Sequence, residues 1–371
     1  MVKHDKLFLK LSEKIPPIFL RLVIYSYINQ EGYVRWSGFA SDIFSIGNGV
    51  RQGAVASPTF FNVYLDDLFK ILKCSGYGCV INNFYYGMLG YADDCSLLTP
   101  SREALQKMLD ICRNYFEEHG IKISVNDNLK KSKTKCLAFN VNLQPANIML
   151  NGKPLPWVDS HEHLGHMIHK DESMCHDLLN KRGEFISKVH ALRQEFGDQS
   201  PDVFMKLVNI YFNSMYGSNV WDLFGDAAQK LFVSWNVLIR SSYNLPFATH
   251  RYILQNIINS PHIRILLMRR FVKFYYQLKN CPKPEITNLL NLQKCDFRST
   301  FGRNCQLLCR ELNVENMENI ILRNISMPIK TPHSEEWRLP FLKELLCLRD
   351  FVPDDLTIHE VNFMIQYVCC T

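Results

Sequence analysis

The 371-residue sequence lacks the features that would place it in a membrane, a secretory route or a repeat architecture. No apolar run reaches the roughly 20 residues that a membrane-spanning helix needs. The first residues, MVKHDKLFLK, are charged and lack the apolar core of a signal peptide. There is no internal repeat, low-complexity stretch or Gly/Ser-rich linker. With 47% hydrophobic and 21% charged residues, the chain is expected to be soluble and globular, with two or three domains and no membrane partner.

Charge and cysteine content place only weak limits on the partners and the cellular location of the protein. A total of 42 Lys and Arg against 36 Asp and Glu leaves a net charge of +6, which permits a polyanionic partner without requiring one. The 13 cysteines are odd in number and scattered, and Cys295, Cys305 and Cys309 form no CxxC pair. This pattern is typical of free thiols, so a nuclear or cytoplasmic location is expected rather than secretion.

One cluster of histidines has some likeness to a zinc protease motif. That motif needs two His four residues apart on one helical face, with Glu after the first. In the segment HEHLGH the Glu-flanked pair is His161 and His166, which are five apart with Gly165 between them. The spacing therefore favours a short hairpin, and a zinc-dependent hydrolase is kept only as an alternative.

Local patterns predict an α+β arrangement followed by long helices. Ser57 and Ser101 are expected to cap two helices that bury their apolar faces. The other predicted helices are 5–29 with a restart at Pro16-Pro17, 172–196, 201–216 and 226–243. The predicted strands are 33–36, 42–46, two strands about a tight turn within 84–98, 121–125 and 136–139.

Two adjacent carboxylates, Asp93 and Asp94, lie at the predicted turn between apolar strands. Burying them would be costly without a cation to neutralise them, and hard oxygen ligands suit Mg²⁺. Since side chains alternate along a strand, one of the two is expected to be the main ligand. A second pair, Asp66-Asp67, lies within a predicted helix and is expected to be a solvated helical surface.

The surroundings of Asp93 and Asp94 make the pattern specific. The segments NGVRQG at 48–53, SP at 57–58 and FNVYLDDL at 61–68 precede YADD at 91–94. This order and spacing resemble motifs B and C of reverse transcriptases, in the non-LTR retrotransposon branch. KKSKTKCLAF at 130–139 is similar to motif D, and His163-Leu164-Gly165 is similar to the motif E turn. Segments between 216 and 251 match the thumb region in order and spacing.

The resemblance implies an RNA-directed DNA polymerase that adds dNTPs to the 3′-hydroxyl of a DNA primer on an RNA template. Two Mg²⁺ ions about 4 Å apart would support this reaction. The residues implied in catalysis are Asp93, Asp94 and Lys133, of which the two aspartates would also bind metal. The residues implied in nucleotide or template binding are Arg51, Gln52, Gly53 and Tyr91. The residues implied in the primer grip are His163, Leu164 and Gly165.

The same resemblance predicts an incomplete metal site. In the family, an acidic residue from motif A lies on a strand beside the metal-binding hairpin. The segment HDKLF at 4–8 is similar to the end of that motif, so its aspartate would fall before Met1, and Asp5 is a poor substitute. The chain is thus expected to be an N-terminally truncated reverse transcriptase that is inactive alone. A non-catalytic nucleic-acid-binding remnant is the alternative.

The expected fold class is α+β, with a partial polymerase palm made of an antiparallel sheet and helices, followed by a mostly helical thumb and C-terminal region. The expected domains are a partial palm at 1–140, a primer-grip hairpin at 141–170, a helical thumb at 171–255 and a C-terminal helical region without an assigned role at 256–371.

Overall fold

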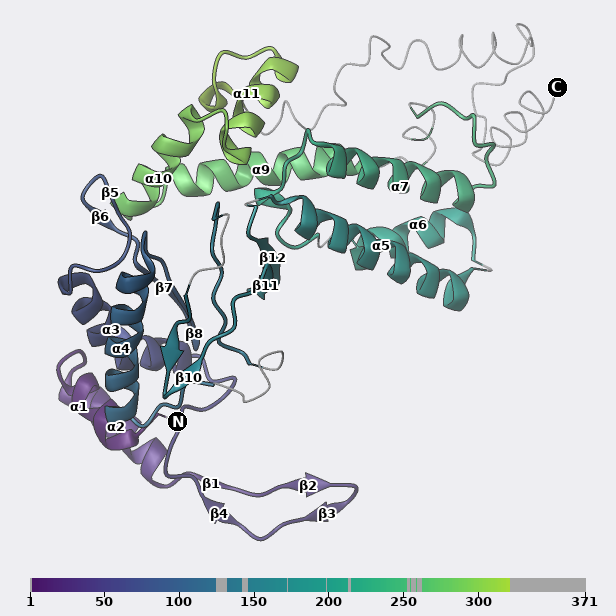
Figure 1. Ribbon diagram of the computed structural model, residues 1–371. Coiled ribbons are helices and arrows are strands. Elements are labelled where there is room, and N and C mark those ends of the chain that lie inside the picture. The colour runs from purple at the N-terminus through teal and green to yellow at the C-terminus, as the bar shows by residue number, and fades with distance from the viewer. Residues whose placement is uncertain are drawn as a thin grey trace, which may run out of the picture. The chain divides into compact units, whose positions relative to one another are not determined.

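A computed structural model describes residues 2–124, 132–141, 146–171, 173–197, 199–212, 215–251, 254, 258 and 262–320. The chain divides into two compact units, Met1–Asp159 and Ser160–Thr371 (Figure 1). Within the described ranges, no helix is long and apolar enough to cross a membrane.

The first unit combines helices with short antiparallel hairpins. Its helices are α1 (His4–Ser12), α2 (Pro17–Ile28), α3 (Ser57–Cys74) and α4 (Arg102–Glu118). Its strand pairs are β1 (Glu31–Gly32) with β4 (Phe44–Ser45), β2 (Arg35–Trp36) with β3 (Phe39–Ala40), β5 (Val80–Ile81) with β6 (Phe84–Tyr85), β7 (Met88–Tyr91) with β8 (Asp94–Leu97), and β9 (Met149–Leu150) with β10 (Lys153–Pro154). Among the described residues every sheet is two-stranded.

The core of the first unit lies between α1, α3 and α4. Leu65, Leu68 and Leu72 of α3 are buried, and Phe61 packs partly against them, as the helical spacing predicts. Leu7 and Leu11 of α1 pack in the same cluster, together with Met108 and Cys112 of α4. Each buried leucine stabilises the folded state by roughly 1.5–3 kcal/mol of apolar transfer free energy. This core forms the support for the β7–β8 hairpin, whose Met88 belongs to the same cluster.

Several local predictions for this unit are confirmed and others are wrong. Ser101 caps α4 by accepting a hydrogen bond from the Ala104 N–H, and the 5–29 helix breaks at the prolines. Ser57 is not a cap, because the helix begins at Ser57 itself and its hydroxyl donates to a backbone carbonyl in the preceding loop. The strand predicted at 136–139 reduces to one bridge between Cys136 and Trp157. At 121–124 there is no regular structure, and Val125 lies outside the described residues.

The second unit starts with a hairpin and continues as helices. The hairpin pairs β11 (Ser160–His163) with β12 (His166–His169). The helices are α5 (Cys175–Phe196), α6 (Pro201–Phe212), the 3₁₀ turn η2 (Ser218–Val220), α7 (Asp226–Ser242), α9 (Ile263–Lys279), α10 (Pro284–Cys295), α11 (Thr300–Leu312) and the 3₁₀ turn η3 (Met317–Asn319). Trp221, Trp235 and Phe271 are fully buried in its core. The α+β class followed by helices is confirmed, while residues 321–371 of the predicted helical C-terminal region lie outside the described residues.

Candidate functional site

The predicted carboxylate hairpin is present as β7–β8. Tyr91 and Asp94 are the last paired residues, and Ala92 and Asp93 form the two-residue turn. Ala92 has φ +51°, whereas Asp93 does not have a positive φ, a combination typical of a type II′ turn. Alanine is unfavourable in that conformation, and backbone strain of this kind is concentrated at functional sites. The turn places Asp93 at the tip, outside the alternation of the two strands.

One face of this hairpin is covered by helices. Met88 is buried in the core, and its pairing partner Leu97 packs partly against the same cluster. At Gly90 a Cβ would lie 2.6 Å from the tip of the Phe69 ring on α3, so a larger residue at this position would require that ring to move. Because successive side chains alternate between faces, Leu89, Tyr91, Asp94 and Ser96 share the opposite face. On that face Leu89 and Tyr91 are exposed.

Both carboxylates are accessible to solvent. Asp93 and Asp94 are exposed, as are Tyr91 and Ala92. The expectation of a buried pair that needs a cation to offset its desolvation is therefore wrong, because a two-residue turn at the end of a short hairpin projects beyond the core. Exposure instead leaves both carboxylates free to bind a ligand from solvent. The carboxylate oxygens are accessible to a hydrated divalent cation, which can also bind a nucleotide phosphate.

The loop before α3 holds the residues predicted to contact nucleotide or template. Gly49 and Gly53 have φ of +96° and +84°, which explains glycine at both positions. Gln52 and Gly53 are exposed. The Arg51 guanidinium donates to the Ser26 carbonyl and lies 5.7 Å from the centroid of the Tyr27 ring, so α2 already engages part of it.

The N-terminal segment fixes this loop from the other side. The Gly49 N–H donates to the Val2 carbonyl at 2.7 Å, and the His4 Nε2 lies 2.8 Å from the Gly49 carbonyl. Sequence reasoning missed these two contacts because they join residues at least 45 positions apart and no local pattern marks them. The loop is therefore held by residues from both α1 and α2.

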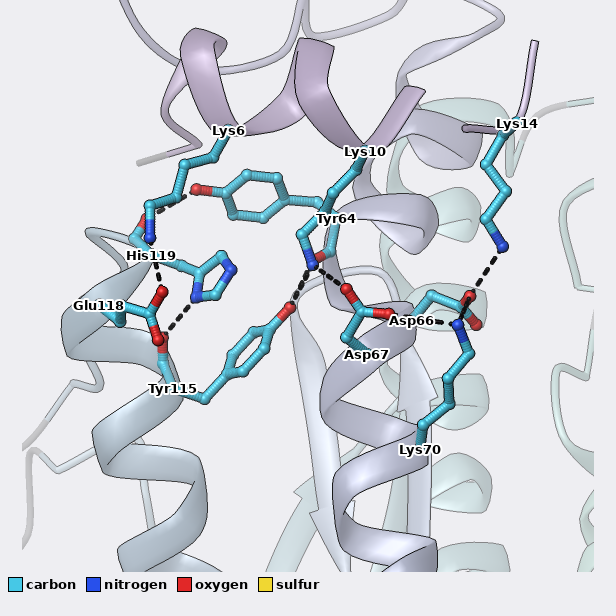
Figure 2. A network of polar contacts seen from close by, with 10 residues as sticks. All are labelled: Lys6, Lys10, Lys14, Tyr64, Asp66, Asp67, Lys70, Tyr115, Glu118 and His119. Atoms are coloured by element: carbon cyan, nitrogen blue, oxygen red, sulfur yellow. Dashed lines mark hydrogen bonds and ion pairs between the residues drawn. The ribbon is translucent and has the colours of Figure 1, made fainter. Parts of the chain in front are cut away.

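Asp66 and Asp67 are not simply a solvated surface, which corrects that prediction. Figure 2 shows them joined to Lys10 of α1, to Lys14 just after that helix and to Lys70 of their own helix. The Lys10 Nζ lies 2.7 Å from an Asp67 oxygen and also 2.7 Å from the Tyr115 hydroxyl of α4. Lys14 and Lys70 each lie 3.0 Å from Asp66. Burial lowers the pKa of Lys10, but the hydrogen bonds to Asp67 and Tyr115 outweigh that effect and raise the pKa overall.

A second set of hydrogen bonds joins α3 to α4 in the same view (Figure 2). The Tyr64 hydroxyl donates to the His119 carbonyl at 2.7 Å, and the Tyr115 hydroxyl donates to the Tyr64 carbonyl at 2.8 Å. The His119 ring stacks on the Tyr115 ring at 3.9 Å. Burial lowers the pKa of His119. The three helices that support the hairpin are thus cross-linked by polar contacts as well as by the apolar core.

Lys133 lies in an anchored segment. Its side chain is exposed. The neighbouring Ser132 hydroxyl donates to the Thr134 carbonyl, and the Thr134 hydroxyl donates to the Ser124 carbonyl, both at 2.9 Å. Cys136 is buried in a cluster against which Leu97 of β8 also packs. The segment therefore shares a small core with the carboxylate hairpin.

The β11–β12 hairpin carries the residues predicted to grip the primer. His163 and His166 pair at its end, and Leu164 and Gly165 both have positive φ (+50° and +76°), as in a type I′ turn. A Cβ at Gly165 would lie 3.1 Å from the ring of Tyr216. Because His161 and His166 lie on two strands rather than on one helix, the zinc protease alternative is wrong and the hairpin is confirmed.

A buried carboxylate that sequence reasoning missed holds this hairpin. Asp177 of α5 is only 1% exposed. It accepts the Trp221 indole N–H at 2.7 Å and the Met167 backbone N–H at 2.9 Å. Its other neighbour is His166, whose Nδ1 lies 3.5 Å from an Asp177 oxygen. The sequence offers no signal for this contact, because Trp221 is 44 positions away.

Comparisons with known proteins match the part of the chain that contains these predicted site residues. Residues 1–168 match the family model described as reverse transcriptase (RNA-dependent DNA polymerase). The chain is 26% identical over 195 residues to the RNA-directed DNA polymerase from mobile element jockey of Drosophila melanogaster. The aligned region covers 51% of this chain and 20% of that protein. The similar polymerase of Drosophila funebris is 24% identical over 196 residues, with the same coverage.

A third relative is the retrovirus-related Pol polyprotein from type-2 retrotransposable element R2DM of Drosophila melanogaster, 28% identical over 130 residues, or 35% of this chain and 11% of that protein. The chain thus spans a fifth or less of the length of the curated relatives it matches. Together with the motifs and the carboxylate hairpin, these matches show that residues 1–168 are similar to reverse transcriptases of the non-LTR retrotransposon kind.

Proposed function

We propose that the chain is the palm and thumb portion of an RNA-directed DNA polymerase, which extends a DNA primer on an RNA template with dNTPs. The observation that carries the proposal is the exposed pair Asp93 and Asp94 at the tip of β7–β8, beside a hairpin face that α3 leaves open. The residues Arg51, Gln52 and Gly53 of the preceding loop would contact nucleotide or template, and Tyr91 would contact the nucleotide from the open face.

In this reaction the primer 3′-hydroxyl oxygen forms a bond to the α-phosphorus of a dNTP and pyrophosphate leaves. Mg²⁺, when bound, would supply the electrophilic charge that stabilises the transferring phosphoryl group. The donor set fits that ion, because Asp93 and Asp94 offer exposed carboxylate oxygens. The exposed ammonium of Lys133 would offset the negative charge that develops on the leaving pyrophosphate.

The second unit would hold the primer and its duplex. The turn of β11–β12, with His163, Leu164 and Gly165, would contact the primer strand, and Asp177 would keep that turn in place. Helices α5 and α7 would follow the duplex backbone through lysine and arginine side chains, a contact that is independent of sequence and weakened by salt. The proposed location is a reducing compartment, nuclear or cytoplasmic, where the ten described cysteines stay free.

We also propose that the chain alone does not synthesise DNA. Two-ion chemistry needs ligands that hold both ions in register, and an adjacent pair of carboxylates on one turn is a small set for that task. A primer-extension assay with Mg²⁺ should give no product. Product that disappears in Asp93→Asn would contradict this proposal.

Binding separates the polymerase proposal from a chain without any nucleic-acid role. Fluorescence anisotropy with a labelled RNA–DNA hybrid should detect binding whose logarithmic affinity falls linearly with the logarithm of the salt concentration. A non-catalytic nucleic-acid-binding remnant would bind the hybrid equally well, but its binding would not respond to dNTP and Mg²⁺. Failure to bind the hybrid even at low salt would contradict both alternatives.

A further inference from the structure

The end of β12 and the first turn of α5 bring two imidazoles and one carboxylate together. The Nδ1 of His169 lies 2.9 Å from one oxygen of Asp171, and the Nε2 of His176 lies 3.2 Å from the other oxygen. The two rings stack with their centroids 4.0 Å apart. All three ligand atoms lie within 4.8 Å of one another. Neither the polymerase reaction nor the primer-grip proposal uses these residues.

The three ligand atoms are close enough for a small ion, but one imidazole must rotate out of the stack, because the in-plane lone pairs of two nearly parallel rings do not point at one position. An ion with bonds of about 2.0–2.2 Å in a tetrahedral arrangement holds its ligand atoms roughly 3.5 Å apart. The carboxylate is already oriented, because the Ser173 N–H donates to Asp171 at 2.8 Å. Hydrogen-bonded outer partners of this kind fix ligands in known metal sites. The side chains of Asp171 and His176 are 47% and 41% exposed, so an ion can enter and solvent can supply a fourth ligand.

We propose that His169, Asp171 and His176 form a binding site for a divalent transition metal of the Zn²⁺ class, with one position open to solvent. Two imidazole nitrogens with one carboxylate favour Zn²⁺ over Mg²⁺, which prefers an all-oxygen shell. The bound ion would cross-link the end of the β11–β12 hairpin to the start of α5. The site is independent of the proposed polymerase function and of the Asp93-Asp94 hairpin.

Metal titration of the full chain tests the proposal. Free thiols also bind Zn²⁺, so the cysteines are first blocked reversibly with a methanethiosulfonate reagent. Competition with a chromogenic chelator should give one Zn²⁺ site that excess Mg²⁺ does not displace. Each of His169→Gln, Asp171→Asn and His176→Gln should weaken that site at least tenfold, since loss even of outer partners costs 10–100-fold.

Two control proteins are matched to these variants. His190→Gln removes an exposed histidine of the same helix, and Asp93→Asn/Asp94→Asn removes the carboxylate pair of the other hairpin. Both should retain the site. Equal zinc affinity in all the proteins would overturn the proposal, as would displacement by Mg²⁺. If the circular dichroism spectrum of a ligand variant shows that it is unfolded, the protein without substitutions is titrated with Co²⁺ instead. Visible d–d bands of Co²⁺ with nitrogen ligands would support the site. A spectrum of hydrated Co²⁺ would overturn it.

Discussion

His262 is a buried histidine whose tautomer is fixed by its two partners. Its Nδ1 accepts the Arg264 N–H at 3.1 Å as the N-cap of α9, so Nε2 carries the proton and donates to Asn236 Oδ1 at 3.1 Å. Burial, with smaller contributions from two nearby arginines, lowers its pKa to about 4. A protonated ring would lose the cap and place a charge in the core.

This histidine should make stability depend on pH. Between about pH 6.5 and 4 the His262 ring is protonated in the unfolded chain but neutral in the folded chain. The contribution of His262 to the free energy of unfolding is therefore complete above pH 6.5 and is lost as the pH falls toward 4. The gap of about 2.5 pKa units corresponds to about 3 kcal/mol of unfolding free energy. Urea unfolding at several pH values measures it. His262→Asn, which can still cap α9, should remove most of this slope; an unchanged slope would contradict the assignment.

Gly90 is the point at which β7 approaches α3 most closely. Gly90→Ala would place a methyl group 2.6 Å from the Phe69 ring, and either the ring or the hairpin must move. We expect a loss of about 1–3 kcal/mol in unfolding free energy, as for other overpacked sites. Gly47→Ala is the matched control, because its Cβ would meet nothing within 4 Å and its φ is not positive. Equal chemical-denaturation midpoints for the two variants would show that the contact does not constrain the hairpin.

At the scale of elements, Asp177 connects a hairpin to a helix and to a buried tryptophan. Asp177→Ala leaves the Trp221 indole N–H and the Met167 N–H buried without this acceptor, at a cost of about 2–4 kcal/mol. Asp177→Asn keeps one acceptor oxygen and should cost less. Trp fluorescence during urea unfolding gives both values. Asp226→Asn, in the exposed first turn of α7, should change stability by no more than about 0.5 kcal/mol. A similar small effect for Asp177→Ala would refute its anchoring role.

Two ion pairs to α3, one from Lys10 of α1 and one from Lys14 just after that helix, allow a direct comparison. The Lys10 side chain is 14% exposed and its Asp67 partner 50%, whereas Lys14 and Asp66 are both at least 40% exposed. Double-mutant cycles with Lys→Met and Asp→Asn should give a coupling of about 1 kcal/mol for Lys10–Asp67 and about 0.3 kcal/mol for Lys14–Asp66. Equal couplings would mean that the partial burial of Lys10 adds nothing.

The elements that sequence reasoning predicted are those whose signals are local. Helical spacing identified the buried face of α3, and Ser101 identified the start of α4, because both depend on residues within a turn or two of each other. The tight turn at Ala92 and Asp93 was predicted for the same reason. The strand predicted at 136–139 failed because an apolar run forms a strand only where a partner is available, and Cys136 makes a single bridge to Trp157.

In the candidate site, too, the features with local sequence signals were predicted and those that depend on distant contacts were not. Order and spacing of motifs placed Asp93, Asp94 and the loop at 48–53 together in one reverse transcriptase unit, and the family match covers them. The exposure of the two aspartates was not predicted, since their apolar sequence neighbours indicated burial while the turn projects away from the core. The contacts of Arg51, Asp67 and Asp177 each join distant parts of the chain, and no periodicity along the sequence marks them.

At the scale of the whole molecule, the central claim is that Asp93 and Asp94 bind a divalent cation together with a nucleotide. Mn²⁺ replaces Mg²⁺ at such oxygen sites, and its electron paramagnetic resonance signal decreases when it binds. With dNTP and an RNA–DNA hybrid present, the chain should bind Mn²⁺ in competition with Mg²⁺, and Asp93→Asn/Asp94→Asn should weaken that binding at least about tenfold, the factor that 1.4 kcal/mol represents. The adjacent pair Asp66→Asn/Asp67→Asn, already engaged by lysines, is the control and should bind Mn²⁺ as before. Equal Mn²⁺ binding by both double variants would contradict the account.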